Sequence, residues 1–242
     1  MTSSKIITKT YIFIGQYLEM ELNGYAVHCP YWANKLKNGK VIIRGFLNGK
    51  GDARSIRAHF IDLLKDQKSG NNSTDKILSN MESFRKYAKR NRTGIDCSGF
   101  VYRILDSLVS LGFVKRDIKK LADIFPGGIS KTNADKLTGP EFTVKINSVS
   151  NARFGDLIRL NGGKHVIFIT GVSSGKLEYV HSSSKLTRDQ GVHEGIIKLV
   201  REKQNLSDQI WMENTKTGNN LGKEYFKIRD SDGIYRPVFL PD

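Results

Sequence analysis

Three side chains in this sequence have the types and the order needed for nucleophilic catalysis: Cys97, His165 and His181. A thiol attacks a carbonyl carbon well when a base beside it takes its proton and a further polar group orients that base. The chain order therefore predicts Cys97 as the nucleophile, His165 as general base and acid, and His181 as the residue that orients the imidazole. The expected reaction is acyl transfer to sulfur followed by hydrolysis, without a metal ion or an organic cofactor.

Cys97 lies where a short polar turn leads into a helical pattern. Residues 94–102 read GIDCSGFVY, and apolar residues then recur at helical spacing at positions 97, 101, 104, 105, 108 and 109. Unpaired N–H groups and the helix dipole favour a thiolate at a helix N-terminus, so we expect a lowered pKa of Cys97. The Cys97 backbone N–H is the expected oxyanion donor, and Gly99 allows close approach of backbone or substrate.

The two histidines lie on segments with strand patterns. Residues 157–160, 165–170 and 177–181 follow one another with short glycine-containing turns between them, which predicts an antiparallel meander. His165 begins the second segment and His181 ends the third, so neighbouring strands can bring the two rings within hydrogen-bond range. Further strand candidates are residues 196–200, 209–212 and 234–239.

Helical patterns dominate the first half of the chain. Helices are expected after Asp52, over residues 75–89, from Cys97 to about 112 and over 115–124, with a short strand at 41–45. Helices followed by antiparallel strands predict an α+β fold. The polar segment 68–74 is the expected linker. It divides an N-terminal region, residues 1–72, from a hydrolase domain over residues 73–242. The N-terminal region has no assigned role, and it is either a separate unit or part of the same domain.

The composition favours an anionic partner. Lysine and arginine outnumber aspartate and glutamate by 39 to 24, which gives a net charge of +15. Such a charge attracts polyanions, which include nucleic acid, anionic membrane surfaces and acidic wall polymers, or it serves only as a solvated basic surface. No nucleic-acid-binding motif accompanies it, so no nucleic-acid partner is expected. No apolar run approaches the ~18 residues that a membrane span requires.

The remaining cysteine and histidines are expected to be structural. Cys29 is predicted to be a small buried residue, because a nucleophilic Cys97 must be free. His59 and His193 are expected to be surface or packing residues, and His28 to lie in a buried aromatic loop. The histidines are dispersed, without CxxC or HxxxH spacing, so no metal site is predicted.

Three motifs together resemble the NlpC-type cell-wall cysteine peptidases, a papain-like family. DCSGFV at residues 96–101 is similar to the family's nucleophile motif. GDLI at 155–158 followed by HVIFI at 165–169 resembles its Gly-Asp strand and His-Val strand, and YVHSS at 179–183 resembles the strand that carries the third residue. The resemblance covers roughly residues 75–200.

The resemblance implies a papain-like fold in which the helix bearing the nucleophile packs on an antiparallel sheet. It also implies hydrolysis of an amide bond in peptidoglycan stem peptides, commonly between γ-D-glutamate and the next diamino acid. Peptidoglycan or another peptide is then the substrate, and a cell-envelope or secreted location is favoured. No signal peptide is predicted, because Lys9 interrupts the first apolar stretch and no small-residue cleavage site follows.

The same resemblance suggests substrate contacts. Asp96 and Ser98 would line the pocket and engage a substrate amine or amide, while both residue types are also favoured as helix caps. Family members carry a Tyr-x-x-Gly-Gly-like stretch about ten residues before the Asp-Cys pair. Tyr87 stands at about that distance without the glycines, so it is either a substrate contact or a packing residue.

Two other interpretations keep the same residues. The triad could serve a delivered effector or toxin, or a phage lysin, including an amidase that cuts the sugar–peptide amide. Alternatively, the chain is an inactive papain-like binding module. That interpretation predicts no thiol reactivity at Cys97 and binding that weakens steeply with salt.

Overall fold

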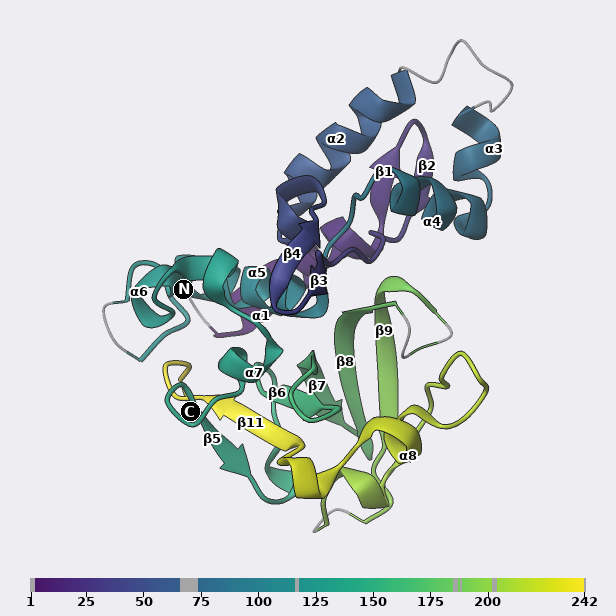
Figure 1. Ribbon diagram of the computed structural model, residues 1–242. Helices are drawn as coiled ribbons and strands as arrows, with labels where there is room; N and C mark the ends of the chain where they lie inside the picture. Colours follow the sequence, from purple (N-terminus) through teal and green to yellow (C-terminus); the bar gives the residue numbers. More distant parts are fainter. Residues whose placement is uncertain are drawn as a thin grey trace.

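The computed structural model describes residues 3–65, 74–115, 118–184, 187, 189–201 and 204–241. Helices fill most of the first half of the chain and an antiparallel sheet most of the second, so the predicted α+β class is confirmed (Figure 1). The predicted linker at 68–74 lies, except for Thr74, outside the described residues. No described helix is both long and apolar enough to cross a membrane.

The main sheet has seven strands in the order β10-β9-β8-β7-β6-β11-β5, and every neighbouring pair is antiparallel. The predicted meander forms its centre as β6, β7 and β8. The strands are β5 (Thr143–Ile146), β6 (Leu157–Leu160), β7 (His165–Ser173), β8 (Lys176–Ser183), β9 (Gly191–Lys198), β10 (Ile210–Trp211) and β11 (Gly233–Pro237).

The helices differ from the predicted ranges at two places. The pattern over 75–89 forms two helices, because the Asn80 side chain accepts hydrogen bonds from the N–H groups of Glu82 and Ser83 and starts a new helix. The expected helix over 115–124 is helical only from Leu121 within the described residues. The helices are α1 (Ser3–Leu18), α2 (Ala53–Lys65), α3 (Thr74–Leu78), α4 (Met81–Arg90), α5 (Cys97–Ser110), α6 (Leu121–Ile124), α7 (Ala134–Leu137) and α8 (Leu221–Tyr225).

The N-terminal region adds two small hairpins to α1 and α2. They pair β1 (Met20–Leu22) with β2 (Tyr25–Val27), and β3 (Lys35–Lys37) with β4 (Lys40–Ile43), where the strand at 41–45 was predicted. In Figure 1, α2, α3, α4 and the β1-β2 hairpin lie above α5, and the large sheet lies below it.

Helix α5 is the centre of the larger hydrophobic core. It packs against α1 on one side and against β7 and β8 on the other. The Tyr17 and Phe100 rings, from α1 and α5, meet edge to face at 5.2 Å between centroids, and both side chains are fully buried. Residues of the N-terminal region therefore share one core with the helix that carries Cys97.

The central strands are apolar on both faces, because side chains alternate along a strand. On β7, Val166 and Phe168 join the core around α5, whereas Ile167 and Ile169 join a second core with Trp211. With helices on one face and the C-terminal segments on the other, the centre of the sheet is shielded from water. The start of β7, where His165 lies, is thus packed between the two hydrophobic cores, one on each face of the sheet.

A buried ion pair joins the turn before β6 to β11. Arg236 donates to both carboxylate oxygens of Asp156, at 2.8 and 2.9 Å, and Asp156 is 1% exposed. The Arg153 N–H also donates to that carboxylate, at 3.0 Å. Asp156 therefore secures the turn that leads into β6.

Removing the arginine should be costly. We expect Arg236→Ala to lower the free energy of unfolding by about 3–5 kcal/mol near neutral pH, because it leaves the buried Asp156 carboxylate without its counter-charge. Burial already raises the pKa of Asp156. Protonation in acid removes the unpaired charge, so the loss should shrink as the pH falls toward about 4. Urea unfolding at both pH values measures it, with the exposed Arg229→Ala as control. An equal loss of unfolding free energy at both pH values would contradict the prediction.

Candidate active site

The turn before α5 is built by Asp96. Its Oδ1 accepts hydrogen bonds from the Gly99 N–H at 2.6 Å and from the Ser98 hydroxyl at 3.0 Å, which caps the helix. Cys97 is the first residue of α5, where N–H groups lack acceptors within the helix. The capping role considered for Asp96 is thus present, and both Asp96 and Ser98 also line a cleft with Cys97.

A segment of the N-terminal region lies directly against this turn. The Asp96 N–H donates to the Gly49 carbonyl oxygen at 2.9 Å, and Lys50 forms an isolated antiparallel bridge with Ile95. A Cβ atom on Gly99 would stand 2.9 Å from the Gly49 oxygen and 3.0 Å from a side-chain carbon of Lys50. The group that approaches Gly99 closely, as expected, is therefore the backbone of Gly49.

Lys50 places a positive charge beside the nucleophile. Its Nζ forms an ion pair with Asp96 Oδ1 at 2.9 Å and hydrogen bonds to Ser98 Oγ and, at 3.2 Å, to the Thr132 carbonyl oxygen. The Lys50 and Asp96 side chains are 13% and 12% exposed. The ammonium therefore compensates the carboxylate next to Cys97 and joins three segments of the chain at the cleft.

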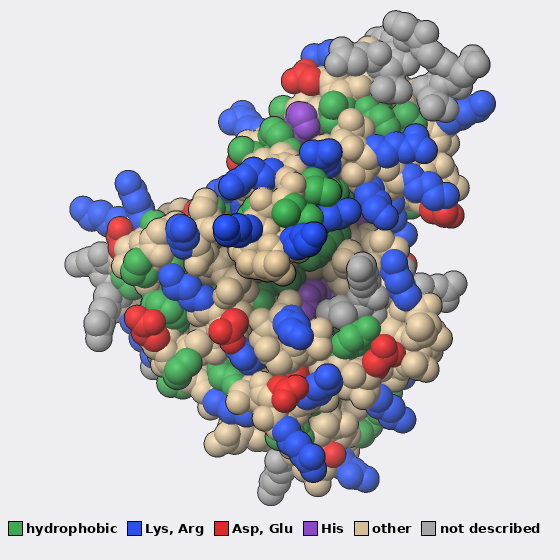
Figure 2. Space-filling view, viewed as in Figure 1, with side chains coloured by type: hydrophobic (Ala, Val, Ile, Leu, Met, Phe, Trp, Pro, Cys, Tyr) green, Lys and Arg blue, Asp and Glu red, His purple; other side chains and the backbone are tan. Residues whose placement is uncertain are grey.

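The cleft that holds Cys97 has a volume of about 830 Å³. Figure 2 shows the molecule hollowed between the part that carries the small hairpins and the part that carries the sheet, with lysine and arginine side chains around the hollow. Polar and charged side chains from the N-terminal region, α5 and the segments near 130 and 163 line the cleft, among them Arg44, Asn48, Lys50, Ser98, Lys131 and Lys164.

The thiol of Cys97 is not preionised, contrary to the expected lowered pKa. Burial, and to a smaller extent the Asp96 carboxylate, raise the pKa of Cys97 to about 12. The Lys50 ammonium and the N–H groups of Ser98 and Val166 act in the opposite direction but do not offset the loss of hydration. The sequence showed the helix N-terminus, but the burial of the thiol, at 7% exposed for the residue, comes from the fold.

Cys97 lies beside the start of β7. The Val166 N–H that acts on the Cys97 thiol belongs to the residue after His165. Within the described residues, the thiol has no hydrogen bond to the His165 ring. Contacts between nucleophile and base often tighten only when substrate binds. The packing of α5 on β7 thus places Cys97 next to the strand that begins with His165.

His165 and His181 are hydrogen-bonded, as their positions on adjacent strands predict. His165 Nε2 lies 2.8 Å from His181 Nδ1, and both residues are buried at 4% and 0% exposure. The other His165 nitrogen, Nδ1, has no hydrogen bond among the described residues. It is therefore the atom available to take a proton from the thiol.

The chain of polar groups continues beyond His181. His181 Nε2 lies 3.2 Å from Glu213 Oε1, and the Tyr179 hydroxyl donates to Glu213 Oε2 at 2.6 Å. Glu213 follows β10, at the edge of the sheet, and its side chain is 9% exposed. A carboxylate at this position can hold the His181 proton on Nε2, which leaves Nδ1 to accept from His165.

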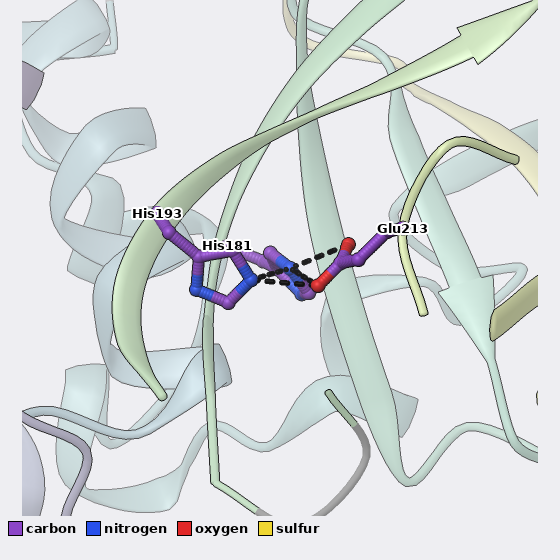
Figure 3. Close-up of side chains that lie close together, drawn as sticks. All are labelled: His181, His193 and Glu213. Atoms are coloured by element: carbon purple, nitrogen blue, oxygen red, sulfur yellow. Dashed lines mark hydrogen bonds and ion pairs between the residues drawn. The ribbon is translucent and has the colours of Figure 1, made fainter. Parts of the chain in front are cut away.

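His193 also belongs to this cluster and is 7% exposed. It was expected to be a surface or packing residue, and the surface position is wrong. Its Nε2 lies 2.7 Å from Glu213 Oε1 and 2.9 Å from His181 Nε2 (Figure 3). Its Nδ1 lies 3.0 Å from the Gly191 carbonyl oxygen. The register explains the contact, because His181 and His193 are direct partners on β8 and β9.

Burial and mutual repulsion lower the pKa of His165 well below its usual value. Burial likewise lowers the pKa of His181, although Glu213 acts against that shift. The neighbouring histidines in turn lower the pKa of Glu213 despite its burial. Near neutral pH the resting site thus contains a neutral thiol, neutral imidazoles at His165 and His181, and an ionised Glu213.

Tyr87 does not line the cleft of Cys97. It borders a separate pocket with Ile77, Lys86 and Arg90, and is 7% exposed. The tyrosine that does line the cleft is Tyr31, whose pKa is raised by burial and further by the nearby Asp96 carboxylate. Sequence reasoning missed Tyr31, Lys50 and Glu213, because no local pattern connects the N-terminal region or the end of β10 with the nucleophile.

The second cysteine lies apart from the cleft. Cys29 is free and 0% exposed, so the prediction of a small buried residue is confirmed. His28, next to it, bonds through Nδ1 to the Val192 carbonyl oxygen at 3.0 Å, and His59 stacks on Phe46 at 4.0 Å between ring centroids. None of these residues contributes to the cluster around His165.

Comparison of the chain with protein-family models, curated proteins and solved structures finds no significant match.

The raised pKa predicts slow alkylation of the resting thiol. We expect Cys97 to react with iodoacetamide more slowly than free cysteine at about pH 8, because little thiolate is present. Lys50→Met should slow the reaction further, since the Lys50 ammonium lowers the pKa of Cys97. Intact-mass analysis across a pH series measures both rates. Lys35→Met, at an exposed position, is the control. Rapid labelling near pH 6 would contradict the prediction.

Proposed function

We propose that this protein is a cysteine hydrolase that cleaves a peptide-type amide bond, with Cys97 as nucleophile, His165 as general base and acid, and His181 as the orienting residue. The observation that carries the proposal is the 2.8 Å contact between His165 Nε2 and His181 Nδ1. His165 lies on β7, the strand that packs against the helix of Cys97. The contact uses Nε2 of His165 and leaves Nδ1 available for the thiol.

The directions of the hydrogen bonds support a general-base mechanism. Glu213 accepts from His181 Nε2, and His181 Nδ1 can then accept from His165 Nε2. The neutral His165 carries its proton on Nε2 and has its lone pair on Nδ1. Because the resting thiol is protonated, His165 removes its proton as sulfur attacks the carbonyl carbon, and the imidazolium forms only at that step.

The rest of the reaction follows from the same groups. The Cys97 N–H, at the start of α5, stabilises the oxyanion of the tetrahedral intermediate. The His165 imidazolium then gives its Nδ1 proton to the leaving amine, and an acyl-enzyme remains on Cys97. A water molecule, deprotonated by the same nitrogen, attacks the thioester, and collapse of the second intermediate returns the free thiol.

The assigned substrate is a stem peptide of bacterial peptidoglycan, cut at the amide between γ-D-glutamate and the next diamino acid. The packing of α5, which carries Cys97, on the antiparallel sheet that carries His165 and His181 supports this assignment, because the motif resemblance implies such an arrangement. The cleft suits a charged peptide, because Lys50, Lys131 and Lys164 line it together with Asp96 and Asp135. The net charge of +15 would retain the enzyme near anionic wall polymers.

The test is digestion of purified peptidoglycan and of synthetic muropeptides, followed by mass analysis of the products. We expect wild-type protein to release fragments with a new amino group on the diamino acid. Cleavage between sugar and peptide would instead assign a lysin-type amidase with the same triad. No cleavage of any peptidoglycan amide, together with salt-sensitive binding of the polymer, would overturn the hydrolase proposal in favour of a binding module.

A further inference from the structure

Beyond hydrolysis, we propose that His181, His193 and Glu213 form a binding site for a divalent transition-metal ion of the zinc type. The three side chains come from β8, β9 and the segment after β10, and their donor atoms converge on one point (Figure 3).

The donor atoms have the separations of ligands around one ion. The two Nε2 atoms are 2.9 Å apart, and Glu213 Oε1 lies 2.7 Å from His193 Nε2 and 3.2 Å from His181 Nε2. Zinc bonds of about 2.0–2.1 Å place neighbouring ligand atoms roughly 3.0–3.4 Å apart. Two imidazoles and one carboxylate are a common ligand set for such an ion. Small movements of the side chains would complete the geometry.

The contacts around the cluster orient each donor toward that point. The Gly191 carbonyl oxygen can only accept, so His193 Nδ1 carries a hydrogen and its Nε2 faces the cluster. His181 Nδ1 faces His165 Nε2, and the Tyr179 hydroxyl donates to Glu213 Oε2. Such second contacts fix the tautomer and orientation of metal-binding histidines and carboxylates.

Without an ion, the same geometry places hydrogen-bond acceptors against each other. If His193 is neutral, its Nε2 lone pair stands 2.7 Å from a carboxylate oxygen, which is also only an acceptor. A metal ion relieves this contact, because it accepts a lone pair from each of the three groups.

The ligands are not recognisable from spacing in the sequence. His181 and His193 are twelve positions apart, but they are direct partners across β8 and β9. Glu213 reaches them because β10 pairs with β9 on its other side. The absence of a CxxC or HxxxH pattern therefore does not exclude this site.

Metal binding would also control the proposed hydrolase, a consequence that rests on the proposed function. An ion on His181 Nε2 forces the His181 proton to Nδ1, where it is donated to His165 Nε2. The His165 proton then lies on Nδ1, so this atom can no longer take the proton of the Cys97 thiol. Zinc is thus expected to be an inhibitor rather than a cofactor.

The test starts with full-length protein freed of metal by a chelator and dialysed. Zn²⁺ affinity is measured by competition with a chromophoric chelator, and site geometry by the visible spectrum of added Co²⁺. We expect one tight site in wild-type protein, and an affinity loss of at least about 100-fold in His193→Gln and Glu213→Gln. Tyr179→Phe, which keeps all three donors, should lose about 10–100-fold. His59→Gln, outside the cluster, is the matched control.

Circular dichroism and thermal melting of each variant without metal show whether it is folded. Wild-type binding no tighter than that of a folded His193→Gln variant, or a Co²⁺ spectrum of the hydrated ion, would overturn the site. If replacing a ligand prevents folding, the zinc affinity of Tyr179→Phe and the Co²⁺ spectrum of wild-type protein still decide whether the site exists.

Hydrolysis is assayed separately from binding. We expect one equivalent of Zn²⁺ to inhibit wild-type hydrolysis, and chelator to restore it. Tight zinc binding by a protein without hydrolase activity in its metal-free form would reject the proposed function and keep the site. An active enzyme without tight zinc binding would reject only the site.

Discussion

Cys97→Ala is expected to abolish hydrolysis, with a fall in kcat of about 10⁵–10⁶-fold, the loss that follows removal of the nucleophile from a triad hydrolase. No other described side chain in the cleft supplies a thiol, because Cys29 is fully buried elsewhere. The variant should stay folded, since the substitution removes one sulfur atom at a residue that borders the cleft.

The matched control is Cys29→Ala, which removes the other free cysteine without touching the cleft. It should retain hydrolysis, although its stability should fall because the residue is fully buried. Release of muropeptide fragments measures both variants. In wild-type protein, mass analysis during turnover should also find an acyl adduct on Cys97. Hydrolysis by a folded Cys97→Ala variant would refute the covalent mechanism.

His181→Leu is expected to lower kcat by about 10²–10⁴-fold with a small change in KM, because His165 loses the partner that places its proton on Nε2. The residue does not border the cleft, so substrate binding should be preserved. His181→Asn can still accept from His165 Nε2 and should recover part of the rate. Glu213→Gln should give an intermediate loss, because a neutral amide holds the His181 proton less firmly.

These variants are compared by steady-state kinetics in the presence of a chelator, which keeps adventitious metal from confusing the result. His59→Gln serves again as the histidine control outside the cluster. A purely structural role for His181 would appear as loss of thermal stability in both His181→Leu and His181→Asn, without partial recovery of kcat by the asparagine. That result would remove His181 from the mechanism and leave Cys97 and His165 to be tested alone.

The site also shows why the Cys97 thiol and the His165 imidazole are uncharged before any substrate binds. Burial disfavours the thiolate at Cys97 and the imidazolium at His165 for the same reason, the loss of hydration around a charge. The Lys50 ammonium is already paired with Asp96. Substrate binding at the cleft would change this balance, because a carbonyl near the Cys97 N–H receives the charge that sulfur donates during attack.

The sequence by itself determined the elements that carry Cys97, His165 and His181. A capping residue before a helical apolar pattern defines α5, and apolar segments separated by glycine turns define β6, β7 and β8. These signals are local, so they can be found without knowledge of the fold. The hydrogen bond between His165 and His181 followed from the same patterns, because a meander places adjacent strands side by side.

Only the tertiary structure decided the rest of the site. Lys50 and Tyr31 reach the cleft because α1 and α5 share a core, Tyr87 is directed to another pocket, and Glu213 arrives through the pairing of β10 with β9. The raised pKa of Cys97 has the same origin. Strand register and burial depend on residues far apart in the chain, and they set which side chains meet and how much water remains around each charge.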